Sequence, residues 1–155
     1  MKKIDSFRNE YFFLSNFYSC PIIYDGIKYR NAECAFQAQK TTDIEMREEF
    51  ATLKPEKGKA LGRKVRLRDN WDTLKFPIMY EIVKAKFEQN PNLAKKLIKT
   101  GDIILEEGNN WGDTIWGTVN GVGENHLGKI LMKVREELKK KKWNTFIYTI
   151  YRKDW

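Results

Sequence analysis

The chain has 155 residues (18.4 kDa), 41% of them hydrophobic, and a formal net charge of +8, a size at which one domain can bury its own core. It contains no apolar run near the ~20 residues of a membrane span, and the first residues, MKKIDSFRNEY, lack the apolar segment of a secretory signal, so we expect a cytoplasmic protein without membrane contact. With one histidine and two separated cysteines, Cys20 and Cys34, the composition all but excludes a zinc site and a Ser-His-Asp triad, and both thiols are expected to be buried and unpaired.

The basic charge has two interpretations. An excess of 29 basic over 21 acidic residues favours a phosphate-bearing partner such as a nucleotide, a nucleic acid or a phosphorylated sugar. Alternatively the lysines mainly keep the protein soluble, since part of the excess lies in one run, residues 139–142. Net charge does not say where a site lies, so both interpretations stay open.

The first part of the chain predicts a hairpin followed by short helices. Residues 11–18 (YFFLSNFY) are rich in aromatic residues and are expected to form a strand. In CPIIYDGIKY, Asp25-Gly26 separates two β-prone runs, which is a strong signal for a two-residue hairpin turn. Caps and stops then predict three helices, over residues 31–40, about 43–53 and about 55–65.

The second part predicts longer elements. A helical pattern follows Asn70, and Pro77 inside it either kinks the helix or marks where its regular part begins. The residues expected on its buried side are Ile78, Ile82, Ala85 and Phe87. A helix from Asn90-Pro91 to Gly101 and a buried strand over residues 102–107 come next.

The end of the chain combines a glycine-rich loop with an amphipathic helix. Residues 108–128 hold six glycines without helical periodicity, which is typical of a long functional loop. The apolar stripe of the final helix consists of Leu127, Ile130, Leu131, Val134 and Leu138. Residues 143–155 (WNTFIYTIYRKDW) are expected to pack on the same domain as an edge strand or a cover over the core. We therefore predict an α+β fold, mainly helical with a few short antiparallel strands, in one domain over residues 1–142 with a C-terminal aromatic extension at 143–155.

The predicted helix NAECAFQAQK carries the first candidate site. Glu33, Gln37 and Lys40 recur at spacings of four and three, so their side chains lie on one narrow face. A carboxylate and an amine so placed can act as general base and nucleophile, or shift each other's pKa. The alternative is an ordinary solvated stripe. The other faces hold only alanines, Cys34 and Phe36, so neighbouring elements must approach this helix closely.

The loop sequence NNWGD carries the second candidate. Trp111 offers a flat surface on which a base can stack, and Asp113 adds a carboxylate two residues later. Alternatively, Asp113 only caps its own turn. The pattern is short, and both interpretations remain open.

Two weaker signals involve anion binding. In LGRKVRLRDNW, the three arginines Arg63, Arg66 and Arg68 suit phosphate contacts, although arginines near a helix end are often simply solvated. In GENHLG, Glu124 or Asn125 can cap the last helix, whose N-terminus could receive an anion.

These segments together resemble the NADAR, or YbiA-like, family. The motifs that carry the resemblance are, in order, FLSNF (13–17), NAECAFQAQK (31–40), LGR with the basic stretch after it (61–68), AKFEQNP (85–91), NNWGD (109–113) and ENHLG (124–128). They cover roughly residues 7–138. The tail from about Trp143 lies beyond the usual end of the family, and where the family often has a larger residue after the acid, this chain has Cys34.

The resemblance implies an N-glycosidase, a hydrolase of N-glycosyl bonds that needs no cofactor or metal. Two substrate types are associated with the family: phosphorylated ribosylamino-pyrimidine intermediates of riboflavin biosynthesis, and ADP-ribose attached to guanine in nucleic acid. Both contain a ribose C1 bonded to nitrogen with phosphate nearby. The resemblance implies neither which substrate is used nor the oligomeric state.

The resemblance also implies roles for residues. Glu33 matches the acid of the first motif, Lys40 closes that motif, and Asp113 belongs to the W-G-D motif, so these three are the expected catalytic residues. Lys40 is expected either to attack C1 and form a Schiff base or to hold phosphate or an ion pair. The expected substrate-binding residues are Asn16, Phe36, Gln37, Arg63, Trp111 and Asn125. The competing hypothesis is a non-catalytic module that binds ADP-ribose or nucleic acid, which predicts salt-dependent affinity and little effect of changing Glu33.

Overall fold

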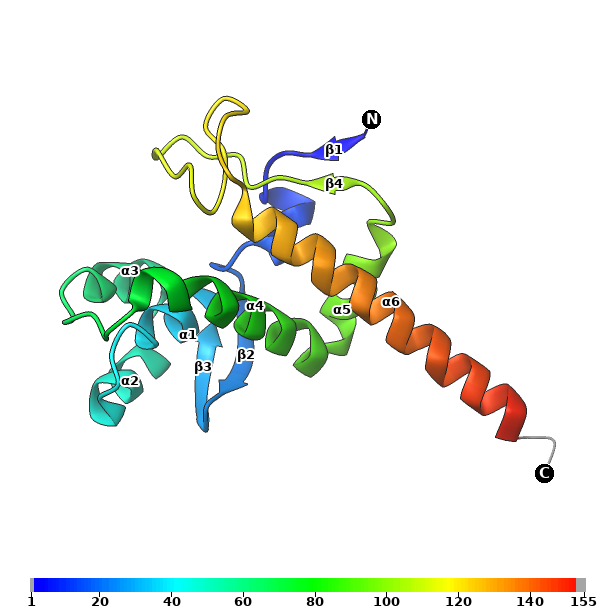
Figure 1. Ribbon diagram of the computed structural model, residues 1–155, viewed down its shortest axis with the longest axis horizontal. Helices are drawn as coiled ribbons and strands as arrows, with labels where there is room; N and C mark the ends of the chain where they lie inside the picture. Colours follow the sequence, from blue (N-terminus) through cyan, green and yellow to red (C-terminus); the bar gives the residue numbers. More distant parts are fainter. Residues whose placement is uncertain (1, 153–155) are drawn as a thin grey trace.

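Two short β-ladders and a set of α-helices make up the chain over residues 2–152, the range that the computed structural model describes, with side chains described through residue 150. The elements are β1 (Lys3–Ile4), the 3-10 helix η1 (Asn9–Leu14), β2 (Ser19–Tyr24), β3 (Ile27–Asn31), α1 (Ala32–Ala38), α2 (Ile44–Ala51), α3 (Pro55–Gly62), α4 (Trp71–Gln89), α5 (Pro91–Lys99), β4 (Ile104–Leu105) and α6 (His126–Arg152) (Figure 1). No helix in this range is long and apolar enough to cross a membrane. The predicted α+β class is confirmed.

The hairpin β2–β3 forms where the sequence predicts it. Asp25 and Gly26 both have positive φ, 48° and 80°, the backbone that a tight turn between twisted antiparallel strands requires. The other ladder differs from the expectation, because β1 pairs with β4 in parallel, with Lys3 opposite Ile104. Only Ile104 and Leu105 of the predicted strand 102–107 are in a ladder.

Residues 11–18 do not form the predicted strand. Their first part belongs to η1, in which Phe13 and Leu14 are buried while Phe12 is 41% exposed. In a helix the aromatic rings of this run point in different directions, so some lie in the core and some on the surface. A strand forms only where a neighbouring strand can pair with it. Lys86 of α4, itself buried, donates from Nζ to the carbonyl of Ser15 at 2.9 Å. That bond fixes the end of η1 against the long helix.

Helix α1 lies at the centre of the fold. The side chain of Asn31 caps it by accepting from the Cys34 N–H at 2.8 Å, as predicted. All seven residues of α1 are buried, because α2, α3, α4 and the hairpin contact it. Helix α3 approaches through two glycines: an added Cβ would lie 2.4 Å from Cys34 Sγ at Gly58 and 1.9 Å from Gln37 Oε1 at Gly62. The polar stripe of α1 is therefore not a solvated face.

The C-terminal extension departs most from the prediction. It continues α6 as one helix to Arg152, and residues 140–150 are all exposed, with Trp143 at 62%. Figure 1 shows this end of α6 projecting away from the rest of the chain. The extension neither forms an edge strand nor covers the core, because its apolar residues are spaced for one face of a free helix rather than for the face that buries Leu131 and Val134. Residues 153–155 of the predicted extension lie outside the described range.

Candidate active site

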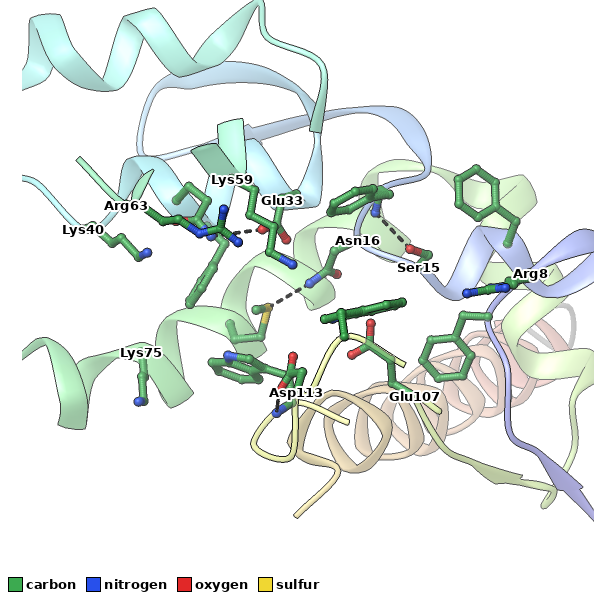
Figure 2. Close-up of a pocket in the computed structure, with 18 of the residues that line it drawn as sticks. Arg8, Ser15, Asn16, Glu33, Lys40, Lys59, Arg63, Lys75, Glu107 and Asp113 are labelled. Atoms are coloured by element: carbon green, nitrogen blue, oxygen red, sulfur yellow. Dashed lines mark hydrogen bonds between the residues drawn. The ribbon is translucent and has the colours of Figure 1, made fainter. Parts of the chain in front are cut away.

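A pocket of about 560 Å³ opens beside α1. Its walls come from η1 and the turn after it, α1, α3, the first half of α4 and the loop between β4 and α6 (Figure 2). Eight of the nine predicted site residues line it: Asn16, Glu33, Phe36, Gln37, Lys40, Arg63, Trp111 and Asp113. The ninth, Asn125, does not.

Glu33 lies in the wall formed by α1. It is only 9% exposed, and Gln37 Nε2 donates to its Oε1 at 3.0 Å. Burial raises the pKa of the Glu33 carboxyl, and Asp113 acts in the same direction, while the hydrogen bond from Gln37 and the nearby Lys59 and Lys40 oppose the shift. A carboxylate with a raised pKa is a better proton acceptor than an ordinary glutamate.

Lys40 stands one turn beyond Gln37 at the end of the same face. Its Nζ donates to the carbonyl of Gly62 at 3.3 Å. Partial burial lowers the pKa of its amine, an effect that Arg63 strengthens and Glu33 opposes. A partly desolvated amine with a lowered pKa suits a nucleophile, and a cation beside Arg63 suits a phosphate. The geometry is compatible with both roles.

The NNWGD loop brings Asp113 into the pocket and caps itself at the same time. Asp113 Oδ1 accepts from the N–H groups of Ile115 (3.0 Å) and Trp116 (2.9 Å), and Asn109 bonds both the N–H and the carbonyl of Asp113. The capping interpretation is therefore confirmed, and the role of Trp111 and Asp113 toward a substrate stays a prediction. Trp111 is 53% exposed at the pocket mouth, with Lys59 Nζ 5.6 Å from its ring centroid.

Aromatic rings form the inner wall. The ring of Phe36 packs against Trp71 at 5.2 Å and against Trp116 at 5.4 Å between centroids. Asn16 donates from its side chain to Met79 Sδ at 3.4 Å, and its carbonyl accepts from the Glu33 N–H at 3.0 Å. Asn16 thus ties the turn after η1 to the start of α1, with its side chain on the pocket.

Asn125, which we expect to bind substrate, does not line the pocket, and its role toward a substrate stays a prediction. Its Nδ2 donates to the carbonyl of Leu105 and its Oδ1 accepts from the N–H of Glu107, both at 3.0 Å. Both polar atoms of its side-chain amide are therefore engaged in hydrogen bonds that hold the segment after β4 against the start of α6. Such long-range pairing of a cap residue has no signature in the local sequence.

Four charged residues of the pocket were not predicted: Arg8, Lys59, Lys75 and Glu107. Lys59 precedes Arg63 by four residues on α3, so the helical period could have placed both on one face. Glu107 ends the predicted strand and directly precedes the glycine-rich loop, a position at which functional side chains often lie. Nothing in the local sequence around Arg8 or Lys75 marks either residue.

Most basic side chains of the pocket lie apart from its acidic ones, whereas Lys59 lies beside Glu33 (Figure 2). Figure 2 shows Glu33, Asp113 and Glu107 around its middle, Lys40, Arg63 and Lys75 toward one side, and Arg8 toward the other. Of the three expected arginines, only Arg63 lines the pocket. Among the described residues, no group of three or more His, Cys, Asp or Glu is placed to hold a metal ion. Acid–base groups thus meet a cationic end that can receive a phosphorylated ligand.

The chain is similar in sequence to several known proteins. The chain is 37% identical over 134 residues to the N-glycosidase YbiA of Escherichia coli strain K12, a match covering 84% of this chain and 83% of that protein. It is 39% identical over 132 residues to a riboflavin biosynthesis protein of Vibrio vulnificus strain YJ016, covering 81% of this chain but only 35% of that longer protein. An N-glycosidase of Acanthamoeba polyphaga mimivirus is 43% identical over 93 residues, covering 51% of this chain and 54% of that protein.

The comparison of folds and the match to a family profile indicate the same family. The NMR structure of the E. coli protein YbiA superimposes with a TM-score of 0.80 at 35% identity, covering 92% of this chain and 89% of the other. The profile of the NADAR domain matches residues 4–139, which include every residue that lines the pocket. This chain belongs to the NADAR domain family.

Proposed function

We propose that the protein is an N-glycosidase that hydrolyses the bond between ribose C1 and the nitrogen of a base or amine in a phosphorylated substrate. The observation that carries the proposal is the buried Glu33, aimed with Gln37 into a pocket whose one end is cationic. Relatives named N-glycosidases, and one named for riboflavin biosynthesis, support the reaction class.

The pocket matches such a substrate in size and polarity. A volume of about 560 Å³ lies in the range of small-molecule sites, roughly 300–1,000 Å³. The phosphate would lie among Lys40, Arg63 and Lys75, where guanidinium and ammonium groups can bind it. The base would stack on Trp111 at the mouth. Ribose then lies in the middle, beside the carboxyl groups.

The chemistry follows from this placement. As the C1–N bond breaks, positive charge develops on C1, and the Glu33 carboxylate either stabilises this charge or takes a proton from the water that attacks C1. Asp113, held by its own turn, orients groups on the opposite side. Lys40 either clamps the phosphate or, when neutral, attacks C1 to form a Schiff base that water then hydrolyses. In both cases the products are the free base or amine and a ribose with a hydroxyl at C1.

The substrate class divides into two candidates, phosphorylated ribosylamino-pyrimidines and ADP-ribosylated guanine in nucleic acid. A hydrolysis assay with a phosphoribosyl aminopyrimidine and with an oligonucleotide carrying ADP-ribosyl-guanine separates them. Turnover of the small substrate alone assigns a metabolic role, and turnover of the oligonucleotide alone assigns a role on nucleic acid.

The catalytic assignment is tested by Glu33→Gln in the same assay. We expect turnover to fall at least about 100-fold, the usual scale for loss of a general base. Glu49→Gln, on the exposed side of α2, is the matched control and should retain turnover. If the wild type cleaves neither substrate but binds one, the non-catalytic binding module takes the place of the enzyme.

A further inference from the structure

Glu107 is a carboxyl group in the pocket that forms no ion pair with any residue that the structure describes. Its Oε2 is shielded from solvent and has no hydrogen-bond partner among the described residues. The preceding residue shows the contrast: Glu106 Oε1 accepts from Thr118 Oγ1 at 2.6 Å, and its Oε2 pairs with Lys3 Nζ at 2.7 Å. The two adjacent glutamates thus differ: Glu106 is hydrogen-bonded and ion-paired, whereas Glu107 lines the pocket with an unpartnered carboxyl oxygen.

The surroundings of Glu107 favour its neutral form. Burial raises the pKa of its carboxyl to about 8, the neighbouring carboxyls of Asp113 and Glu33 act in the same direction, and Lys59 opposes them. The other cations of the pocket, Arg8, Lys40, Arg63 and Lys75, form no ion pair with it in the described chain. A neutral carboxyl has a proton to donate, whereas an ionised one can only accept.

The backbone holds Glu107 rigidly over the pocket. Its N–H donates to Asn125 Oδ1 at 3.0 Å, and its carbonyl accepts from the Thr118 N–H at 2.9 Å. Gly117 lets this loop pack closely, since a Cβ there would lie 2.0 Å from the Glu107 carbonyl oxygen. The backbone that carries the Glu107 side chain is therefore fixed beside the pocket.

We propose, resting on the N-glycosidase function above, that Glu107 is the general acid that protonates the leaving nitrogen. Asp113 is the weaker candidate for that role, because its Oδ1 is engaged by two backbone N–H groups. Glu33, which accepts from Gln37 and faces Lys59 and Lys40, serves as the base. Both carboxyls line the same pocket, Glu33 from α1 and Glu107 from the segment after β4 (Figure 2).

The proton transfers balance. The Glu107 proton passes to nitrogen as the electron pair of the C1–N bond moves onto that nitrogen. Water adds its oxygen to C1 and gives a proton to Glu33. The cycle leaves Glu107 ionised and Glu33 protonated, and exchange with solvent restores both. No oxidant or reductant is required, and water is the only second reactant.

The test compares Glu107→Gln with the wild type on two phosphoribosyl substrates, one of an aminopyrimidine and one of 4-nitrophenol, which leaves as a stable phenolate without prior protonation. We expect kcat for the aminopyrimidine to fall about 100-fold or more and kcat for the 4-nitrophenol substrate to fall much less, because only the first leaving group needs a proton. Glu106→Gln, at the paired neighbour, should keep the wild-type ratio between the substrates. Equal losses on both substrates, or no loss, would overturn the role of Glu107.

The dependence of kcat on pH provides a second test, because a purely structural role of Glu107 would not change its shape. In the wild type, kcat should decline as the pH rises through the raised pKa of Glu107, about 8, because the acid loses its proton; Glu107→Gln should lack that decline. Nuclear magnetic resonance of ¹³C-labelled glutamate carboxyls tests the protonation state without turnover, and an ionised Glu107 at roughly pH 5 would contradict the proposal. A wild type inactive on both substrates would instead overturn the N-glycosidase function, and the general-acid role with it.

Discussion

Gln37 donates from Nε2 to Glu33 Oε1 at 3.0 Å, one helical turn away on α1, while its own Oε1 is buried without a hydrogen-bond partner in the described chain. Gly62 packs directly against this amide, 1.9 Å from Oε1 if it carried a Cβ. The amide is therefore held in one orientation by close packing. Its donor side is committed to the Glu33 carboxylate.

Gln37→Met tests what that hydrogen bond does. The bond lowers the pKa of Glu33 against the effect of burial, so its loss should raise that pKa further. Since the base must be ionised, the rise of kcat with pH should move to higher pH, by an amount set by the loss of a hydrogen bond to a charged group. The measurement is kcat against pH. Gln89→Met, outside the pocket on α4, should leave the position of that limb unchanged.

Arg63→Gln tests the cationic end. We expect KM for a phosphorylated substrate to rise about tenfold or more, with kcat largely kept, because a charge-assisted phosphate contact contributes binding in ground state and transition state alike. The same variant should bind the dephosphorylated substrate as the wild type does. Arg66→Gln, exposed and outside the pocket, is the matched control. An equal rise of KM on both substrates would place the phosphate elsewhere.

Lys86 makes stability depend on pH. Burial lowers the pKa of its amine to about 8, below the value of about 10.4 expected in the unfolded chain. Between these values the unfolded chain binds a proton that the native protein lacks, so this group increases the free energy of unfolding as pH rises, by about 1 kcal/mol per pH unit. Below the lower value, the buried charge opposes folding by a constant amount.

The change Lys86→Met isolates this contribution. Urea unfolding of both proteins at several pH values should show the wild type gaining stability relative to the variant through this window. The difference between the two free energies of unfolding cancels the titration of tyrosines and other lysines. A difference that does not vary with pH would show that Lys86 keeps an ordinary pKa despite its burial.

Ending the chain after Lys142 tests the exposed extension of α6. Because residues 143–150 are exposed, their removal should change the free energy of unfolding by no more than about 0.5 kcal/mol, the usual range for surface changes. Hydrolysis by the pocket should be unaffected. Thermal unfolding and the hydrolysis assay measure both. A large loss of stability would mean that the extension packs on the domain after all, as its apolar residues first suggested.

Local patterns decided those features whose causes lie within a few residues. The Asp25-Gly26 turn depends on positive φ, and the start of α1 depends on the Asn31 side chain reaching the Cys34 N–H. The single face shared by Glu33, Gln37 and Lys40 follows from the helical period alone. The resemblance of the motifs to a known family indicated nine site residues, and eight of these nine line the pocket.

Tertiary structure alone decided the rest. Glu106 and Glu107 are adjacent and chemically identical, yet Glu106 pairs with Lys3 and Glu107 lines the pocket. The pair forms because β4 lies beside β1 only in the folded chain. The side chain of Asn125 holds two segments together because Leu105 and Glu107 lie next to it in space. The sequence by itself determined turns, caps and helix faces, since these depend on local dihedral preferences and periodicity. Which carboxyl is paired and which is left alone depends on partners distant in the chain, and only packing places them.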